Sequence, residues 1–398
     1  MADQRSDIEK EIREQIRKAK APPRRKGGGR RLALILLLLL AVAAGFWYAS
    51  NRDLLSMDRM RRVMSYNKAE DGAELFRYDS DRSASYNLLG DNLIIVSTSR
   101  IQMLGGDGAE LWSKTVNFTN PAIALGAETA AVYDVGGREL YLFGARGLAR
   151  DMSGECENGV LAVSINASDY LALTTLKSGY RSAVTVYTAT GERVFTFNSS
   201  ERYISDACVP ADNRHLGVVT LGESEGVFAS RMTFYSFDST EAISETTLSG
   251  SMVLSLGNLG GKLAALQDDR LTVFDAGGAL SGSCRYDYPY LRGHSFFGNE
   301  FAVLLLSRYR SGGAMRLLTV DGDGQRLGLL DERREIVDIS AAGKFVAVLY
   351  ADSLTIYTEE LKEYATLSGT DYAKRVIMRP DGTALLVGAS RSRLFVPE

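Results

Sequence analysis

From residue 71 onward, apolar residues come in short runs rich in β-branched and aromatic side chains, separated by Gly, Asp and Asn. Examples are LIIVS (93–97), FAVLLL (301–306) and FVAVLY (345–350). Short apolar runs between turn-forming residues are typical of β-strands, and no long 3.6-residue periodicity competes with them. This part of the chain is therefore predicted to be all-β.

The strands recur as a repeat. The hexapeptide DGAELF at Asp71–Phe76 returns as DGAELW at Asp107–Trp112, and further strand–turn–strand units follow. Their turns are spaced by about 42 residues on average, which is the period of four-stranded propeller blades. A second series of turns precedes the buried strands, from Asp91-Asn92 to Asp381-Gly382.

Two strands at opposite ends of this region have no hairpin partner. They are an outer strand at Glu74–Tyr78 and a third strand at Arg393–Val396. Pairing them completes an eighth blade and removes the open sheet edges that an unclosed ring exposes. We therefore predict an eight-bladed β-propeller over residues 71–398, with seven blades as the alternative.

A different pattern precedes the repeats. Residues 32–50 read LALILLLLLAVAAGFWYAS, an uncharged stretch long enough to cross a bilayer as a helix. Lys and Arg crowd its N-terminal side, so the positive-inside rule predicts a cytoplasmic N-terminus and a propeller outside the cell. A signal peptide cleaved near Ala41-Val42-Ala43 is the alternative, but the preceding 31 residues are too long for one. Residues 51–70 are predicted to form a stalk.

The charge is divided between these parts. The chain carries a formal net charge of −3, but residues 1–31 hold a clear excess of Lys and Arg. This basic tail is expected to contact anionic lipid headgroups. Ile8, Ile12 and Ile16 suit a short amphipathic helix that either binds a partner or rests on lipid. The near-balanced total gives no sign of nucleic-acid binding.

Few residues suggest catalytic or metal chemistry. Cys156, Cys208 and Cys284 are isolated from one another, which favours reduced packing residues over a zinc site or a disulfide framework. His215 follows a turn at the start of a strand, where a structural role is favoured. Asp321–Gly324 resembles part of a calcium loop but occupies a hairpin-turn position. We predict no catalytic residues, no metal and no cofactor.

The repeat also carries a family resemblance. Asp107–Trp112 resembles the repeat of quinoprotein-like propellers, and Arg379-Pro380-Asp381-Gly382 resembles the turn of WD-type blades. With the apolar span, the chain resembles a bacterial family of single-pass membrane proteins that carry a quinoprotein-like propeller outside the cell. Quinone-dependent enzymes of this fold have adjacent cysteines and a calcium site, which this sequence lacks. The resemblance therefore implies no enzymatic activity.

Candidate binding residues come from the long loops. Loops joining second to third strands are expected at Lys177–Arg181, Gly222–Ser230 and Arg308–Gly313, and they share one propeller face with the blade-to-blade connections. Tyr and Arg dominate interface hot spots. The candidates are Tyr180, Arg181, Tyr286, Tyr288, Tyr290, Arg292, Arg308, Tyr309 and Arg310. The alternative is that the tyrosines only cap blade cores.

These features favour a non-catalytic binding scaffold, held at the membrane by residues 32–50, for an extracytoplasmic protein or cell-wall component. One alternative is an extracytoplasmic enzyme acting on glycans or peptides, which requires paired carboxylates in the central channel. Another is a sensor that couples outside ligand binding to the Ile8/Ile12/Ile16 helix. The fold alone is compatible with all three.

Overall fold

The structure is a computed structural model that describes residues 74–79, 84–224, 226–298 and 300–397. The predicted tail, membrane span and stalk lie outside the described residues. Among the residues described, no helix is long and apolar enough to cross a membrane.

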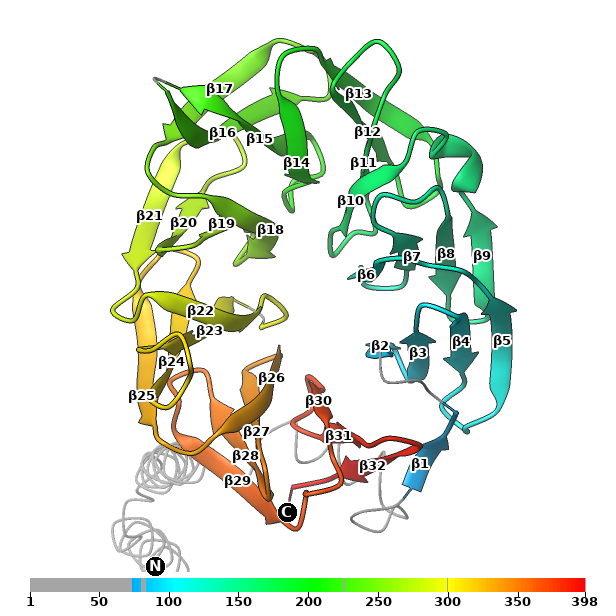
Figure 1. Ribbon diagram of the computed structural model, residues 1–398, viewed down its shortest axis with the longest axis vertical. Helices are drawn as coiled ribbons and strands as arrows, with labels where there is room; N and C mark the ends of the chain where they lie inside the picture. Colours follow the sequence, from blue (N-terminus) through cyan, green and yellow to red (C-terminus); the bar gives the residue numbers. More distant parts are fainter. Residues whose placement is uncertain (1–73, 80–83, 225, 299, 398) are drawn as a thin grey trace, which may run out of the picture. The chain divides into compact units, whose positions relative to one another are not determined.

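Eight four-stranded antiparallel sheets form a closed ring of blades (Figure 1). Blades 1 to 4 follow one another along the chain. Their strands, from the inner to the outer, are β2 (Ser85–Leu89), β3 (Asn92–Val96), β4 (Arg100–Leu104) and β5 (Glu110–Thr115); β6 (Pro121–Leu125), β7 (Ala130–Asp134), β8 (Leu140–Gly144) and β9 (Gly147–Asp151); β10 (Val160–Ile165), β11 (Leu171–Thr175), β12 (Ser182–Tyr187) and β13 (Arg193–Ser199); and β14 (Tyr203–Cys208), β15 (His215–Ser224), β16 (Val227–Ser236) and β17 (Ala242–Leu248).

Blades 5 to 8 complete the ring. Their strands are β18 (Val253–Leu259), β19 (Lys262–Gln267), β20 (Arg270–Phe274) and β21 (Leu280–Arg285); β22 (Tyr290–Ser295), β23 (Phe301–Ser307), β24 (Met315–Asp321) and β25 (Arg326–Glu332); β26 (Ile336–Ala342), β27 (Phe345–Tyr350), β28 (Ser353–Thr358) and β29 (Glu363–Ser368); and β30 (Arg375–Met378), β31 (Ala384–Val387), β32 (Arg391–Phe395) and β1 (Glu74–Arg77). A short 3-10 helix, Ser153–Glu155, lies between blades 2 and 3.

The core lies between the blades. The described residues form eight clusters of buried apolar side chains, each shared by two neighbouring blades. Second strands such as β23 and β27 are buried along their whole length, which explains their continuous apolar sequences. Outer strands such as β17 and β25 alternate between exposed and half-buried positions, because only one side faces a neighbour.

The ring closes as the sequence predicts. β1 pairs antiparallel with β32, bringing Arg77 opposite Arg391, and blade 8 thus joins both ends of the propeller region (Figure 1). Just after β1, the backbone N–H of Tyr78 donates to the carbonyl of Ser390 at 3.0 Å. The buried hydroxyl of Tyr78 donates to the carbonyl of Gly388 at 3.1 Å. The eight-bladed prediction is confirmed over the described residues.

Antiparallel order gives the ring two distinct faces. We call the side with the first-to-second and third-to-fourth strand turns the turn face, and the side with the second-to-third loops and blade connections the loop face. Asp321 illustrates the turn face. Its Oδ1 accepts from the backbone N–H groups of Asp323 and Gln325, so the calcium-like sequence forms a hairpin turn.

Two loop predictions are wrong. Residues 222–230 are not a long loop, because β15 and β16 continue to pair through Gly222 and Ala229 up to a tight turn. A blade-to-blade connection was expected at Tyr286–Arg292, but Tyr290 and Arg292 belong to the inner strand β22, where Tyr290 pairs with Ser307 at the end of β23 and Arg292 lies at a β-bulge. Both errors arise where polar or glycine-containing sequence takes part in regular backbone pairing.

Candidate functional site

The structure separates the predicted site residues into two groups. Tyr180 and Arg181 belong to the loop between β11 and β12 in blade 3. The other seven lie where blade 5 passes into blade 6 and in the loop between β23 and β24. The candidates, which were expected to share one face of the propeller, are therefore divided between two regions that lie three blades apart.

The blade 3 region is small. Tyr180 is exposed, and the Arg181 guanidinium lies 5.4 Å from the ring centre of Tyr203, the first residue of the neighbouring inner strand. It also lies within 3.4 Å of the Tyr203 hydroxyl. Arg181 therefore links blades 3 and 4, and an exposed pair of tyrosines flanks it.

Tyr286 is a packing residue. Its ring packs against the core shared by blades 5 and 6, and its hydroxyl is buried. Burial, reinforced by Cys284, raises the pKa of the Tyr286 hydroxyl far above its ordinary value. The alternative, that a tyrosine caps a blade core, is the correct description of this residue.

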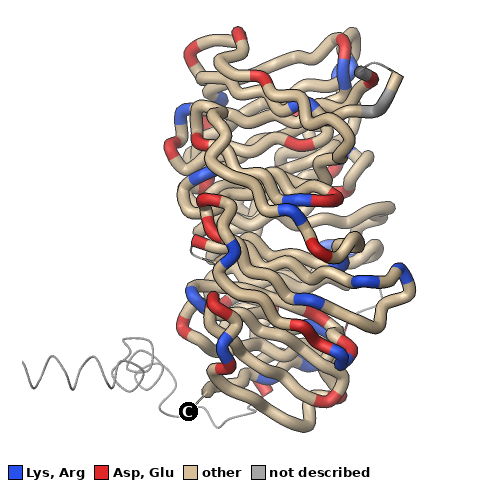
Figure 2. Tube along the Cα trace, turned by 90° about the vertical axis from the view of Figure 1, so that its left-hand side faces the viewer, with Lys and Arg blue, Asp and Glu red and all other residues tan. Residues whose placement is uncertain are grey.

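Tyr288 is held in an ionic network on the side of blades 5 and 6. The Arg316 guanidinium lies 4.3 Å from the ring centre of Tyr288 and pairs with Asp331 at 2.7 Å and Asp287 at 3.2 Å. Arg326 also pairs with Asp287, at 2.6 Å. Acidic and basic residues lie close together along this side of the ring (Figure 2). Tyr288 thus contributes to joining outer strands.

The remaining five residues form one patch. Arg292 reaches from the inner strand to the loop between β23 and β24, where its guanidinium donates to the carbonyls of Tyr309, at 3.2 Å, and Arg310. Arg308 lies 5.7 Å from the ring centre of Tyr309. Tyr290 lies opposite Ser307 at the base of the loop. We call Tyr290, Arg292, Arg308, Tyr309 and Arg310 the blade 6 patch.

The blade 6 patch is exposed and cationic. The Tyr309 side chain is 52% exposed, and Tyr290 is also exposed. Arg308 and Arg310 form no ion pair with any residue that the structure describes. Their charges are therefore available to an anionic group. The loop that carries them is held in place by the hydrogen bonds from Arg292 to its carbonyl groups.

The inner strands do not provide a pair of catalytic carboxylates. Across the eight inner strands, which are all described, the acidic residues are Asp206 in blade 4 and Asp338 in blade 7. Asp206 accepts from the backbone N–H of Leu256 at 2.8 Å, and Asp338 accepts from that of Val376 at 2.9 Å. Each carboxylate thus hydrogen-bonds the inner strand of the next blade.

The cysteines and histidines take structural positions. Cys156, Cys208 and Cys284 are free and buried, and burial raises the pKa of the Cys156 and Cys208 thiols to about 12. His215 begins β15, and its Nδ1 lies 2.5 Å from an Asp212 carboxylate oxygen. His294 lies in the inner strand β22 with its ring against Phe296, and desolvation lowers its pKa. Over the described ranges, no cluster of three metal-ligating side chains is found.

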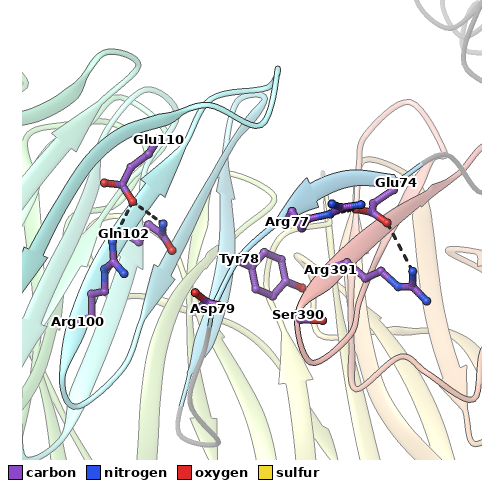
Figure 3. Close-up of a pocket in the computed structure, with 9 residues that line it drawn as sticks. All are labelled: Glu74, Arg77, Tyr78, Asp79, Arg100, Gln102, Glu110, Ser390 and Arg391. Carbon is purple, nitrogen blue, oxygen red and sulfur yellow. Dashed lines mark hydrogen bonds and ion pairs between the residues drawn. The ribbon is translucent and has the colours of Figure 1, made fainter.

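A groove that sequence analysis did not identify lies at the closing seam, between blade 8 and blade 1 (Figure 3). Its volume is about 740 Å³, and it is open to solvent. We call it the seam groove. It is lined by Glu74, Arg77, Tyr78, Asp79, Arg100, Gln102, Glu110, Ser390 and Arg391.

The repeat contained a signal for the seam groove. Glu74 and Glu110 occupy the same position in the two copies of the hexapeptide, and both line the groove. Arg77 lies three residues after Glu74 and is paired with Arg391 of the neighbouring strand β32. Ser113 lies three residues after Glu110 and is paired in the same way with Gln102 of β4. Gln102 and Arg391 are therefore equivalent strand positions. Sequence reasoning used this motif only for its period and its turn.

Comparison with known proteins identifies the family. A protein family described as a family of unknown function, DUF5711, matches residues 61–387, which is most of the chain. The chain belongs to this family. No curated protein matches it.

Solved structures share the architecture. The C-terminal WD40 domain of Sif2 is 13% identical, with a TM-score of 0.57 over 83% of this chain and 99% of that domain. The Dos1 propeller is 10% identical, with a TM-score of 0.50 over 82% of this chain and 93% of that one. BamB from Moraxella catarrhalis is 11% identical, with a TM-score of 0.48 over 82% and 100%. The likenesses to the Sif2 domain and the Dos1 propeller support the propeller fold alone.

Proposed function

We propose that this protein is a membrane-anchored, extracytoplasmic propeller that acts as a non-catalytic binding scaffold for an envelope protein or a cell-wall component. The blade 6 patch carries the proposal. Its loop is held in place by Arg292, so little conformational entropy is lost when a partner binds. It presents tyrosine and arginine, the residue types that most often dominate binding energy.

The positive charge of the blade 6 patch favours an anionic partner. Arg308 and Arg310 supply guanidinium groups that form no ion pair with any described residue, and these suit carboxylate or phosphate groups. An acidic protein surface or an anionic wall polymer fits this chemistry. Asp206 and Asp338 each accept from a backbone N–H of the next blade, which favours a structural role for both carboxylates over the enzyme alternative.

The binding proposal is tested by photo-crosslinking in living cells. A photoreactive amino acid at Ser311, an exposed residue of the same loop, is expected to give discrete crosslinked species. Arg308→Ala/Arg310→Ala should abolish them, because hot-spot arginines each contribute about 2 kcal/mol or more. Arg146→Ala/Arg214→Ala, which removes two exposed arginines from the turn face, is the matched control. Crosslinks that persist in the loop variant would refute the patch as the binding site.

The location is tested separately. The cation excess before residue 32 is the basis for placing the propeller outside the cell. Protease added to intact, wall-stripped cells should digest the propeller and spare the N-terminal tail. Survival of the propeller, when a known external protein is digested in the same sample, would overturn this topology.

A further inference from the structure

The seam groove contains a hydrogen-bond acceptor that has no partner. The Gln102 amide nitrogen donates to Glu110 at 2.6 Å. A carboxylate only accepts hydrogen bonds, so this contact fixes the amide nitrogen toward Glu110 and leaves Oε1 on its other side. That oxygen is buried and unpartnered, and the whole residue is only 8% exposed. Seven buried side chains of the described chain have an unpartnered polar atom, and of these Gln102 lines the groove.

An unpartnered buried acceptor destabilises the free protein by about 1–3 kcal/mol. Another buried glutamine avoids this cost. Gln267, buried in blade 5, has its Oε1 satisfied by the Thr272 hydroxyl at 2.5 Å. Of the seven unpartnered atoms, that of Gln102 belongs to a residue lining the groove, where a bound ligand can supply the donor. Functional sites retain such polar groups although stability alone disfavours them.

The surroundings hold Gln102 and Glu110 in place. Glu110 accepts from the Ser113 hydroxyl at 2.6 Å and from Arg100 at 2.9 Å, in addition to Gln102. The hydrogen bond from Ser113, followed by that from Gln102, lowers the pKa of Glu110. Glu110 therefore stays ionised near neutral pH and keeps the Gln102 amide in one orientation (Figure 3).

The charges lining the groove balance. Glu74, Asp79 and Glu110 provide three carboxylates, and Arg77, Arg100 and Arg391 provide three guanidinium groups. Arg77 and Arg391 both pair with Glu74, at 2.6 and 3.6 Å. A phosphate or polyanion requires excess cations, and a cationic ligand requires excess acids. Hydroxyl groups donate to carboxylates and amide oxygens and accept from guanidinium groups, so they match a lining that contains equal numbers of acidic and basic side chains.

We propose that the seam groove binds an uncharged glycan through its hydroxyl groups, with one hydroxyl donating to Gln102 Oε1. Its volume lies within the range of about 300–1,000 Å³ typical of small-molecule sites. The proposal shares with the proposed function only the assignment of the ring as a binding module. It uses blades 8 and 1 rather than the blade 6 patch.

The test measures binding of chitotetraose and cellotetraose to the full-length protein in detergent, by calorimetry and saturation-transfer NMR. At least one of them should bind, and Gln102→Met should weaken its binding about tenfold, the effect of losing one ligand hydrogen bond. The melting temperature of Gln102→Met should stay close to that of the wild type, because the variant removes an unpartnered acceptor along with one hydrogen bond. Gln267→Met is the matched control: it removes a satisfied buried amide and should lower stability without changing affinity.

Three further results complete the design. If Gln102→Met fails to fold, Arg77→Ala replaces it, since that side chain is 85% exposed and its removal should weaken glycan binding several-fold. Arg308→Ala/Arg310→Ala should bind the glycan normally, so failure of the blade 6 patch leaves this result standing. Absence of glycan binding, equal affinity in all groove variants, or binding only of pyrophosphate or tetra-alanine would overturn the proposal.

Discussion

The carboxylate of Asp206, on the inner strand of blade 4, accepts a hydrogen bond from the backbone N–H of Leu256 in blade 5 at 2.8 Å. The backbone N–H of Ala207 also donates to it, at 2.8 Å. Burial nevertheless outweighs these hydrogen bonds and raises the pKa of Asp206 from 3.8 to about 6. The residue that links two blades is therefore also a group that titrates near neutral pH.

This raised pKa makes stability depend on pH. Between pH 4 and 6 the folded chain holds the Asp206 proton more tightly than the unfolded chain, so this contribution to the free energy of unfolding falls as pH rises. Lowering the pH from 7 to 4 should stabilise the wild type relative to Asp206→Asn by about 2 kcal/mol. Denaturant unfolding followed by Trp112 fluorescence measures the difference. Asp212→Asn is the control, because the Asp212 pKa is lowered and its contribution has the opposite sign. A difference that does not change with pH would contradict the assignment.

Closing the ring requires the last strand. Deleting Ser392–Glu398 removes most of β32, including the buried Leu394 and Phe395, and leaves β1 and β31 without their common partner. Loss of two large buried side chains alone costs more than about 4 kcal/mol. The melting temperature should fall, and the exposed edge should promote aggregation detectable by light scattering. Deleting only Pro397–Glu398, which follow β32, should have little effect. A stable, monomeric longer truncation would argue against closure by this strand pair.

The buried thiols should be inert in the folded protein. A pKa near 12 leaves Cys156 and Cys208 almost wholly protonated at pH 7.5, and the thiolate is the reactive species. A thiol-specific reagent such as Ellman's reagent should therefore react with neither cysteine in the native protein, and with all three in guanidinium chloride. Rapid labelling of Cys156 or Cys208 in the folded state would contradict their burial.

Tyr288 and Tyr309 should respond differently to substitution. Tyr288→Leu removes the ring beneath Arg316 and should destabilise the propeller by about 1 kcal/mol, without affecting a partner bound at the blade 6 patch. Tyr309→Ala should leave stability within about 0.5 kcal/mol of the wild type and weaken partner binding. Thermal unfolding together with crosslinking yield measures both properties. Loss of crosslinks in Tyr288→Leu with unchanged stability would instead place Tyr288 in the interface.

The sequence predicted the ring better than its sites. Turn pairs such as Asp91-Asn92 and Asp381-Gly382 define where strands begin, and the buried second strands are nearly pure apolar runs, so period and closure follow from local chemistry. Tyr286 and Arg308 both directly follow a strand, yet Tyr286 packs against a blade core and Arg308 is exposed. Only the three-dimensional packing distinguishes them. Residue type alone therefore could not separate core from surface.

The seam groove is formed by residues that are far apart in the sequence. Glu74 and Arg391 are far apart in sequence, and they meet only because the ring closes through β1 and β32. A pattern of hydrophobic and polar positions predicts that such strands exist and lack partners. It does not predict which side chains line the gap between the two blades that they bring together.

The pairing of β1 with β32 also has a consequence for biosynthesis. β1 leaves the ribosome before any other propeller strand, yet its only sheet neighbour among the described strands is synthesised last. Blade 8 therefore cannot form until β32 has been synthesised, and β1 must wait for this partner while the other seven blades are made. The seam groove, which needs residues from β1 and from the start of β32, then exists only in chains in which β32 has been made, so a product that terminates before β32 lacks this site.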